Sequence, residues 1–124
     1  MGAAPAARER AARTLQALWD DGNGRLSVQV LQEFYLGVTR KLGTPVARST
    51  AREVIGAYGS WVRSATTVET VIRASDIAEL AQIAFWDALI VASAEQEGAT
   101  LLYSEDLNDG QVIAGVRVVN PLVA

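Results

Sequence analysis

The chain has 124 residues, of which 50% are hydrophobic, and carries a formal net charge of −3 with neither cysteine nor histidine. This length and apolar content suit a single domain, residues 1–124, with one core. The missing residue types exclude a disulfide framework, a thiolate or histidine metal site, and a catalytic triad that depends on histidine. Because the sequence has neither an apolar run of membrane length nor a signal-peptide pattern, we expect a cytoplasmic protein.

The charge is divided unevenly along the chain. Residues 1–63 carry nine Lys or Arg against five acids, whereas residues 64–124 carry two Arg against nine acids. A basic half can approach phosphate while an acidic half binds a metal ion, although a solvated helical surface explains the same counts.

Apolar residues at three- and four-residue steps predict helices in the first half of the chain. The first covers residues 8–19, and the second starts after Ser27 as N-cap and runs to residue 42. Thr44 and Pro45 open the third, which ends near Tyr58, with Pro45 at the favoured first position.

The second half alternates between helical and extended patterns. Helices are predicted at residues 68–74, at 76–84 with Ser75 or Asp76 as cap, and at 85–97, where the helix is apolar nearly all round and therefore buried. Strands are predicted at residues 61–66, 100–103 and 116–119. Strands separated by helices indicate an α/β fold with a parallel sheet covered by helices.

Acidic residues follow the strand at residues 100–103. Glu105, Asp106 and Asp109 lie close together there. A hard cation such as Mg²⁺ or Mn²⁺ would offset their mutual repulsion, but an acidic surface turn explains the same residues.

Two further carboxylates belong to helices. Asp87 begins the buried helix, where free backbone N–H groups and the helix dipole stabilise a carboxylate without any metal. Glu33 lies off the apolar stripe of its helix and, alone, is typical of a solvated glutamate. Because strand ends and the following helix starts meet at one edge of a parallel sheet, these acids and the acids after residue 103 could gather there.

Several sequence blocks together resemble PIN-domain proteins, particularly VapC-type toxins of toxin-antitoxin systems: residues 27–35, 85–94, 102–111 and 120–122. The resemblance implies an endoribonuclease that depends on Mg²⁺ or Mn²⁺, binds a cognate antitoxin protein and forms a homodimer. It places Glu33, Asp87 and Asp106 on the family's catalytic, metal-binding acids and Asp109 on an accessory acid. It also places Ser104 on the hydroxyl residue of a Thr/Ser-x-Asp motif.

Basic residues in the first half of the chain are the candidates for contacting RNA. Phosphate contacts are expected from Arg40 and Lys41, with Arg48 and Arg52 as further candidates. An ordinary helix surface is the alternative interpretation of each of these residues.

The chain departs from the family at its start. PIN domains begin with a central apolar strand that ends in the first metal-binding Asp, whereas this chain opens in what resembles the following helix. We therefore expect an N-terminally incomplete PIN-like domain, with a short parallel sheet, helices on both faces, no central first strand and impaired nuclease activity. The alternative is a catalytically inactive module that binds an antitoxin or another protomer. A third interpretation, a Mg²⁺-binding phosphatase or receiver domain, is the least favoured of the three.

Overall fold

The computed structural model describes residues 3–41 and 43–123. Its elements, in chain order, are α1 (Ala3–Asp21), α2 (Val28–Thr39), α3 (Arg48–Tyr58), the short 3-10 helix η1 (Gly59–Trp61), α4 (Val68–Ala81), α5 (Phe85–Gln96), β1 (Leu101–Tyr103), β2 (Val112–Ile113) and β3 (Val116–Val119). This order confirms the predicted α/β class.

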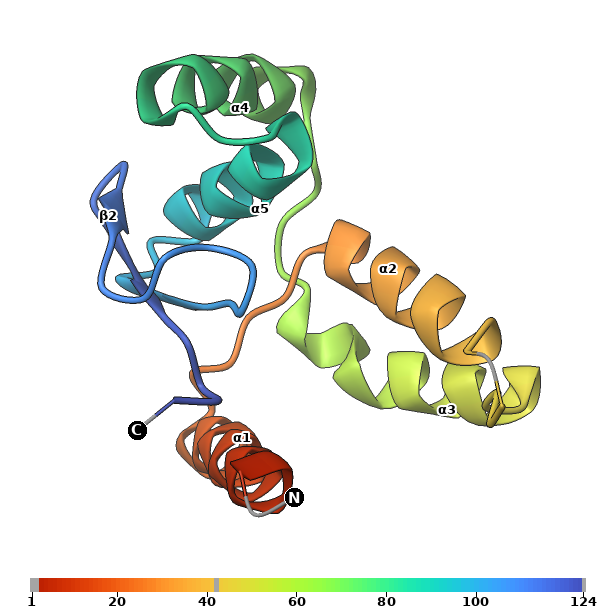
Figure 1. The fold of residues 1–124 in the computed structure, drawn as a ribbon. Coiled ribbons are helices and arrows are strands. Elements are labelled where there is room, and N and C mark those ends of the chain that lie inside the picture. The colour runs from red at the N-terminus through yellow and green to blue at the C-terminus, as the bar shows by residue number, and fades with distance from the viewer. Residues whose placement is uncertain (1–2, 42, 124) are drawn as a thin grey trace.

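Helices α2 and α3 form a hairpin that projects from the rest of the molecule (Figure 1). The predicted cap of α2 is confirmed, because the Ser27 side chain accepts a hydrogen bond from the Val30 N–H. The predicted start of α3 is wrong. The helix begins at Arg48, after a turn in which the Val46 N–H donates to the Val38 carbonyl, so Pro45 lies in the connection.

The predictions for residues 61–84 need correction. Residues 61–66 form no strand, because η1 closes the hairpin and an irregular connection follows. Residues 68–81 form one helix rather than two. Thr67 and Thr70 make a reciprocal capping box at its start. Ser75 and Asp76 lie on the exposed face of this helix and do not interrupt it.

The sheet has three strands in the order β1-β3-β2. β1 pairs in parallel with β3, with Leu102 opposite Val118, but β2 pairs with β3 in the antiparallel direction and was not predicted. A tight turn with positive φ angles at Ala114 and Gly115 joins β2 to β3. The parallel part of the sheet is therefore one strand pair.

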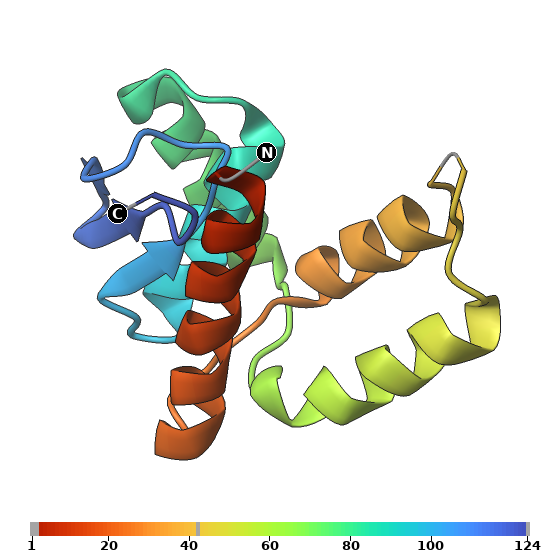
Figure 2. The same cartoon turned by 60° about the horizontal axis from the view of Figure 1, so that its bottom comes forward.

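The core lies between the sheet and the α4–α5 pair. Val91 of α5 and Val118 of β3 are fully buried, together with Ala74 and Ala88. The two views place α1 on the other side of the sheet (Figures 1 and 2), where the Arg10 guanidinium donates to the Leu122 carbonyl. Helices therefore lie on both sides of the sheet, as predicted.

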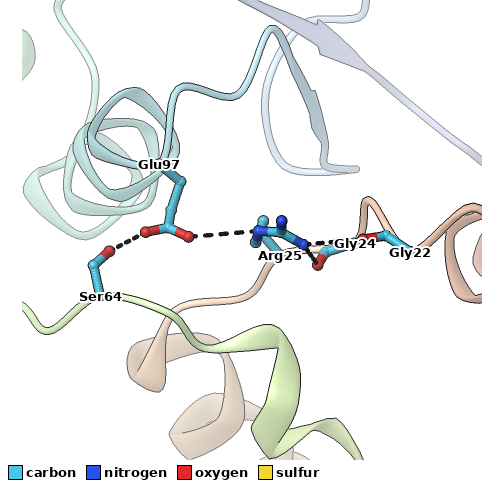
Figure 3. A network of polar contacts seen from close by, with 5 residues as sticks. All are labelled: Gly22, Gly24, Arg25, Ser64 and Glu97. Atoms are coloured by element: carbon cyan, nitrogen blue, oxygen red, sulfur yellow. Dashed lines mark hydrogen bonds and ion pairs between the residues drawn. The ribbon is translucent and has the colours of Figure 1, made fainter.

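A polar network joins the connections on either side of the hairpin to the end of α5 (Figure 3). The Ser64 hydroxyl donates to one carboxylate oxygen of Glu97, and the other lies 3.7 Å from Arg25 Nε. The Arg25 guanidinium also donates to the Gly24 carbonyl at 2.7 Å. One carboxylate at the end of α5 thus contacts both connections.

An aromatic cluster of Trp19, Tyr58 and Trp61 joins the end of α1 to the end of the hairpin. Its ring centroids are 4.8–5.1 Å apart, and Trp19 Nε1 donates to the Tyr58 hydroxyl.

In the described residues no single helix is long and apolar enough to cross a membrane. Helices α4 and α5, which meet at a bend of 117°, have the length and composition of a membrane span only when they are taken together.

Candidate functional site

A pocket of about 260 Å³ lies between the end of α4, the start of α5 and the loop after β1. Asp87 and Asp106 both line it. These residues come from separate elements, and the fold brings them together where β1 ends and α5 begins, as expected for a ligand site of an α/β sheet.

Asp87 lies in the first turn of α5 and is half-buried. The N-cap residue, Ala84, has no side chain that could accept a hydrogen bond from the first N–H groups. The positive end of the helix dipole therefore favours a carboxylate at Asp87. Ala88 and Leu89, which follow directly, are buried in the core and hold this end of α5 in place.

Asp106 is held by the loop that follows β1. Its backbone N–H donates to the Ser104 side-chain oxygen at 3.2 Å, which turns the chain directly after the strand. Leu107 packs against the core, and the Gln111 N–H donates to the Asn108 carbonyl at 3.1 Å. The exposed carboxylate of Asp106 is thus carried by an anchored loop.

Three residues with side-chain amides, none of them among the predicted site residues, complete the polar lining of the pocket: Gln82, Asn108 and Gln111. Gln82 ends α4 in the left-handed conformation, with φ 55°, which is uncommon outside glycine. An acidic surface turn was one interpretation of the residues around Asn108, but no sequence pattern indicated that Gln82 or Gln111 would face the same pocket.

Glu33 lies in a neighbouring groove of about 730 Å³, which is lined by α2, Ile55 and Trp86. Gln29, one helical turn before Glu33, donates from Nε2 to the Trp86 carbonyl at 3.1 Å, so this face of α2 lies beside the start of α5. Among residues 3–41 and 43–123, no group of three or more acidic side chains is placed to hold a metal ion. The structure thus brings Asp87 and Asp106 into one pocket and Glu33 into the next.

The remaining predicted residues lie elsewhere. Asp109 Oδ1 accepts the Asn120 N–H at 2.8 Å and so ties the loop to the segment after β3. Arg40 and the adjacent Lys41 follow α2 at the end of the hairpin away from α5, and neither lines the pocket of Asp87 and Asp106 (Figure 1).

Comparisons with known proteins identify the family. No curated protein and no solved structure matches the chain. The PIN-domain family profile matches residues 3–110, which include every acid discussed above. PIN domains are a family of nucleases, generally dependent on divalent metal ions and often found in toxin-antitoxin systems. Because the match covers most of its length, the chain belongs to the PIN-domain family.

Proposed function

We propose that this protein is a VapC-type toxin, a metal-dependent endoribonuclease whose metal-binding acids are Asp87 and Asp106. The observation that carries the proposal is the shared pocket of these two side chains, which come from different elements and meet where β1 ends and α5 begins. A nuclease of this type acts on nucleic acid and often pairs with an antitoxin, and here we propose RNA and a cognate antitoxin protein as the partners.

The pocket residues fit Mg²⁺ or Mn²⁺. Two carboxylates and three amide groups line the pocket, and Mg²⁺ is commonly held by one or two carboxylates, with water and substrate phosphate as its other ligands. Asp87 and Asp106 would hold the ion. The bound ion would polarise the phosphate and lower the pKa of an attacking water.

The protein's own residues would position the RNA. The Ser104 oxygen already accepts the Asp106 N–H, so its hydroxyl hydrogen is left to donate to a phosphate oxygen. Arg40 and Lys41 would contact phosphates farther along the strand, since both are exposed at the end of the hairpin. Glu33, in the neighbouring groove, is proposed as a third acid that would contribute to holding the ion, and Asp109 as an accessory acid that keeps the Asp106 loop in place.

The proposal is tested by removing both carboxylates of the pocket. The Asp87→Asn, Asp106→Asn double variant keeps the side-chain volumes but loses both charges, so it should neither bind Mn²⁺ in a calorimetric titration nor cleave RNA. Asp21→Asn, at the exposed end of α1, is the matched control and should behave like the parent protein. Unchanged Mn²⁺ binding in the double variant would show that Asp87 and Asp106 do not hold the metal ion.

A second candidate is a catalytically inactive module that binds an antitoxin or another protomer. The absence of a three-acid group among the described residues favours it, because two carboxylates hold a cation less firmly than three. Losing one electrostatic contact in the transition state costs about a hundredfold or more in rate, so we expect weak cleavage at most.

An added strand separates the two candidates. In the described sheet β1 pairs only with β3, so its other edge is free to pair. Prefixing an apolar strand that ends in Asp should strengthen Mn²⁺ binding and restore cleavage if the protein derives from an active nuclease. An extended protein that folds and binds Mn²⁺ but cuts nothing would favour the inactive module, and full-rate cleavage by the unextended chain would show that the added Asp is dispensable.

A further inference from the structure

Trp86 is an exposed aromatic side chain beside the pocket of Asp87 and Asp106. Its surface is 64% exposed, against 40% for Trp19 and 7% for Trp61, which pack together in the aromatic cluster. Trp86 lines the groove, whereas Asp87, the next residue of α5, lines the pocket. The indole ring therefore lies where the pocket and the groove adjoin.

The indole is carried by a fixed part of the backbone. The Trp86 carbonyl accepts a hydrogen bond from Gln29 Nε2 at 3.1 Å, and Gln29 is only 8% exposed. The Phe85 ring, which packs against the core, meets the Trp86 ring in a T-shaped contact with centroids 5.4 Å apart. A ring supported in this way loses little conformational freedom when a flat ligand stacks on it, so it is preorganised for binding.

The lining of the groove suits a nucleobase better than a phosphate. Val28 and Leu36, which are 46% and 45% exposed, continue the apolar surface from Trp86. The described residues that line the groove include neither Lys nor Arg, so a phosphate would find no cationic partner there. Every nucleobase, in contrast, has a π-face that can stack on an aromatic ring.

We propose that Trp86 positions the substrate by stacking on the base next to the scissile phosphate. A base is joined to its phosphate through a single sugar, so a phosphate held at Asp87 and Asp106 brings its base to the adjacent residue of α5. Stacking fixes the nucleotide relative to the pocket, as aromatic side chains do for unpaired bases of single-stranded RNA. This inference rests on the proposed ribonuclease function, because it takes RNA as the ligand.

Equilibrium binding of single-stranded RNA tests the stacking contact. The probe is a fluorescein-labelled RNA of about eight nucleotides that contains all four bases, and its reference is an abasic ribose-phosphate oligomer of the same length. Fluorescence anisotropy in Mn²⁺ buffer gives the dissociation constants, and gel electrophoresis verifies that the RNA stays intact. Trp86→Ala should raise the constant for RNA by about tenfold and leave the constant for the abasic oligomer unchanged.

Two further variants control for the shape and the exposure of the side chain. Trp86→Phe keeps an aromatic ring and should recover most of the RNA affinity. Val68→Ala removes a side chain that is 71% exposed and lines neither the pocket nor the groove, so it should bind RNA like the parent.

Tryptophan fluorescence reports on the contact directly. A stacked base quenches indole emission, so RNA should quench the parent more strongly than Trp86→Phe, which retains Trp19 and Trp61. Equal quenching of the two proteins would place the RNA away from Trp86 and overturn the proposal.

The outcomes separate this inference from the proposed nuclease function. Circular dichroism verifies that each variant is folded, and Mn²⁺ titration of Trp86→Ala should match the parent. Unchanged RNA affinity in the folded Trp86→Ala protein, or an equal loss for the abasic oligomer, overturns the stacking contact even if the parent binds Mn²⁺ and cleaves RNA. A parent that binds neither oligomer also overturns it and leaves Trp86 to a protein partner. A preference for RNA that depends on Trp86, in a protein that cleaves nothing, supports the stacking contact and contradicts the nuclease function.

Discussion

Single residues decide how closely the segments of this protein approach each other. Gly24 is buried in the connection after α1, where a Cβ atom would lie 2.5 Å from the Trp61 ring. Glycine is therefore required here for lack of space rather than for an unusual backbone angle, and it lets the connection lie directly against the aromatic cluster.

Gly24→Ala should therefore destabilise the protein. The added methyl group forces the Trp61 ring or the connection to move, which costs about 1–3 kcal/mol in the free energy of unfolding. Gly56→Ala is the matched control, because nothing lies within 4 Å of a Cβ there. In the middle of α3 that change should stabilise by about 0.5–1 kcal/mol. Urea denaturation measures both, and a Gly24→Ala protein as stable as the parent would contradict the prediction.

The ion pair between α4 and α5 should make stability depend on pH. The guanidinium of Arg73 donates two hydrogen bonds to Glu95, at 2.8 and 2.9 Å, and holds the pKa of that carboxyl below its usual range. A depressed pKa stabilises the folded state above the carboxyl's unfolded pKa, and this contribution is lost as the pH falls toward the folded value.

Glu95→Gln should consequently lose stability at pH 7 and match the parent in strong acid. Because the pair is partly exposed, the loss should be below about 1 kcal/mol. Thermal unfolding followed across the acidic range measures the difference, with the exposed Glu53→Gln as control. An equal difference at every pH would show that packing, rather than charge, accounts for the change.

At the scale of the elements, side-chain caps begin α2 and α4, whereas α3 and α5 begin without one. Ser27 caps α2, and Thr67 caps α4 through a capping box with Thr70. The same reasoning was wrong where a polar residue on the exposed face of a helix resembled a cap. Ser75 and Asp76 follow buried Ala74 and precede buried Ile77, so the helix continues through them because its inner face stays apolar.

Thr67→Ala should lower the stability of α4 and of the molecule. The Thr67 side chain accepts the Thr70 N–H, and losing a cap of this kind costs about 1 kcal/mol. Thr66→Ala is the matched control, because Thr66 precedes the cap and is exposed. Thermal unfolding should show a lower midpoint for Thr67→Ala alone, and equal midpoints would contradict the role of the cap.

At the scale of the whole molecule, a few contacts join α1, the hairpin and the body formed by α4, α5 and the sheet. Glu97 contacts Arg25 and Ser64, and the Leu26 N–H donates to the Trp61 carbonyl at 3.0 Å. The position of the groove on α2 relative to Trp86 depends on these contacts and on the bond from Gln29 to the Trp86 carbonyl.

Glu97→Ala should loosen the connections without unfolding the body. Arg25 and Ser64 would lose their shared acceptor, so backbone amides in residues 22–27 and 62–67 should exchange with deuterium faster. Exchange in α5, whose buried face packs in the core, should stay close to that of the parent. Glu53→Ala on α3 is the control, and unchanged exchange in both connections would show that the network contributes little to their order.

Much of this fold follows from local patterns in the sequence. The apolar run of residues 85–97 predicted the buried helix, and the residues around Asp87 and Asp106 carried the resemblance to PIN domains that the family match supports. These predictions succeed because helix periodicity, capping and short motifs depend on neighbouring residues. The sequence did not predict the short strand β2 or the irregular segment 62–67, because both are too short to show a periodic pattern of apolar residues.

By itself, the sequence determined the residue types available for chemistry: oxygen ligands without cysteine or histidine, and acids concentrated in the second half. Only the tertiary structure decided which of them share a pocket. Asp87 and Asp106 meet because α5 packs against β1 and β3, whereas Glu33 follows α2 into the neighbouring groove. The reason is physical: the spacing of residues along a helix determines its faces, but the packing of one element against another depends on contacts between residues far apart in the chain.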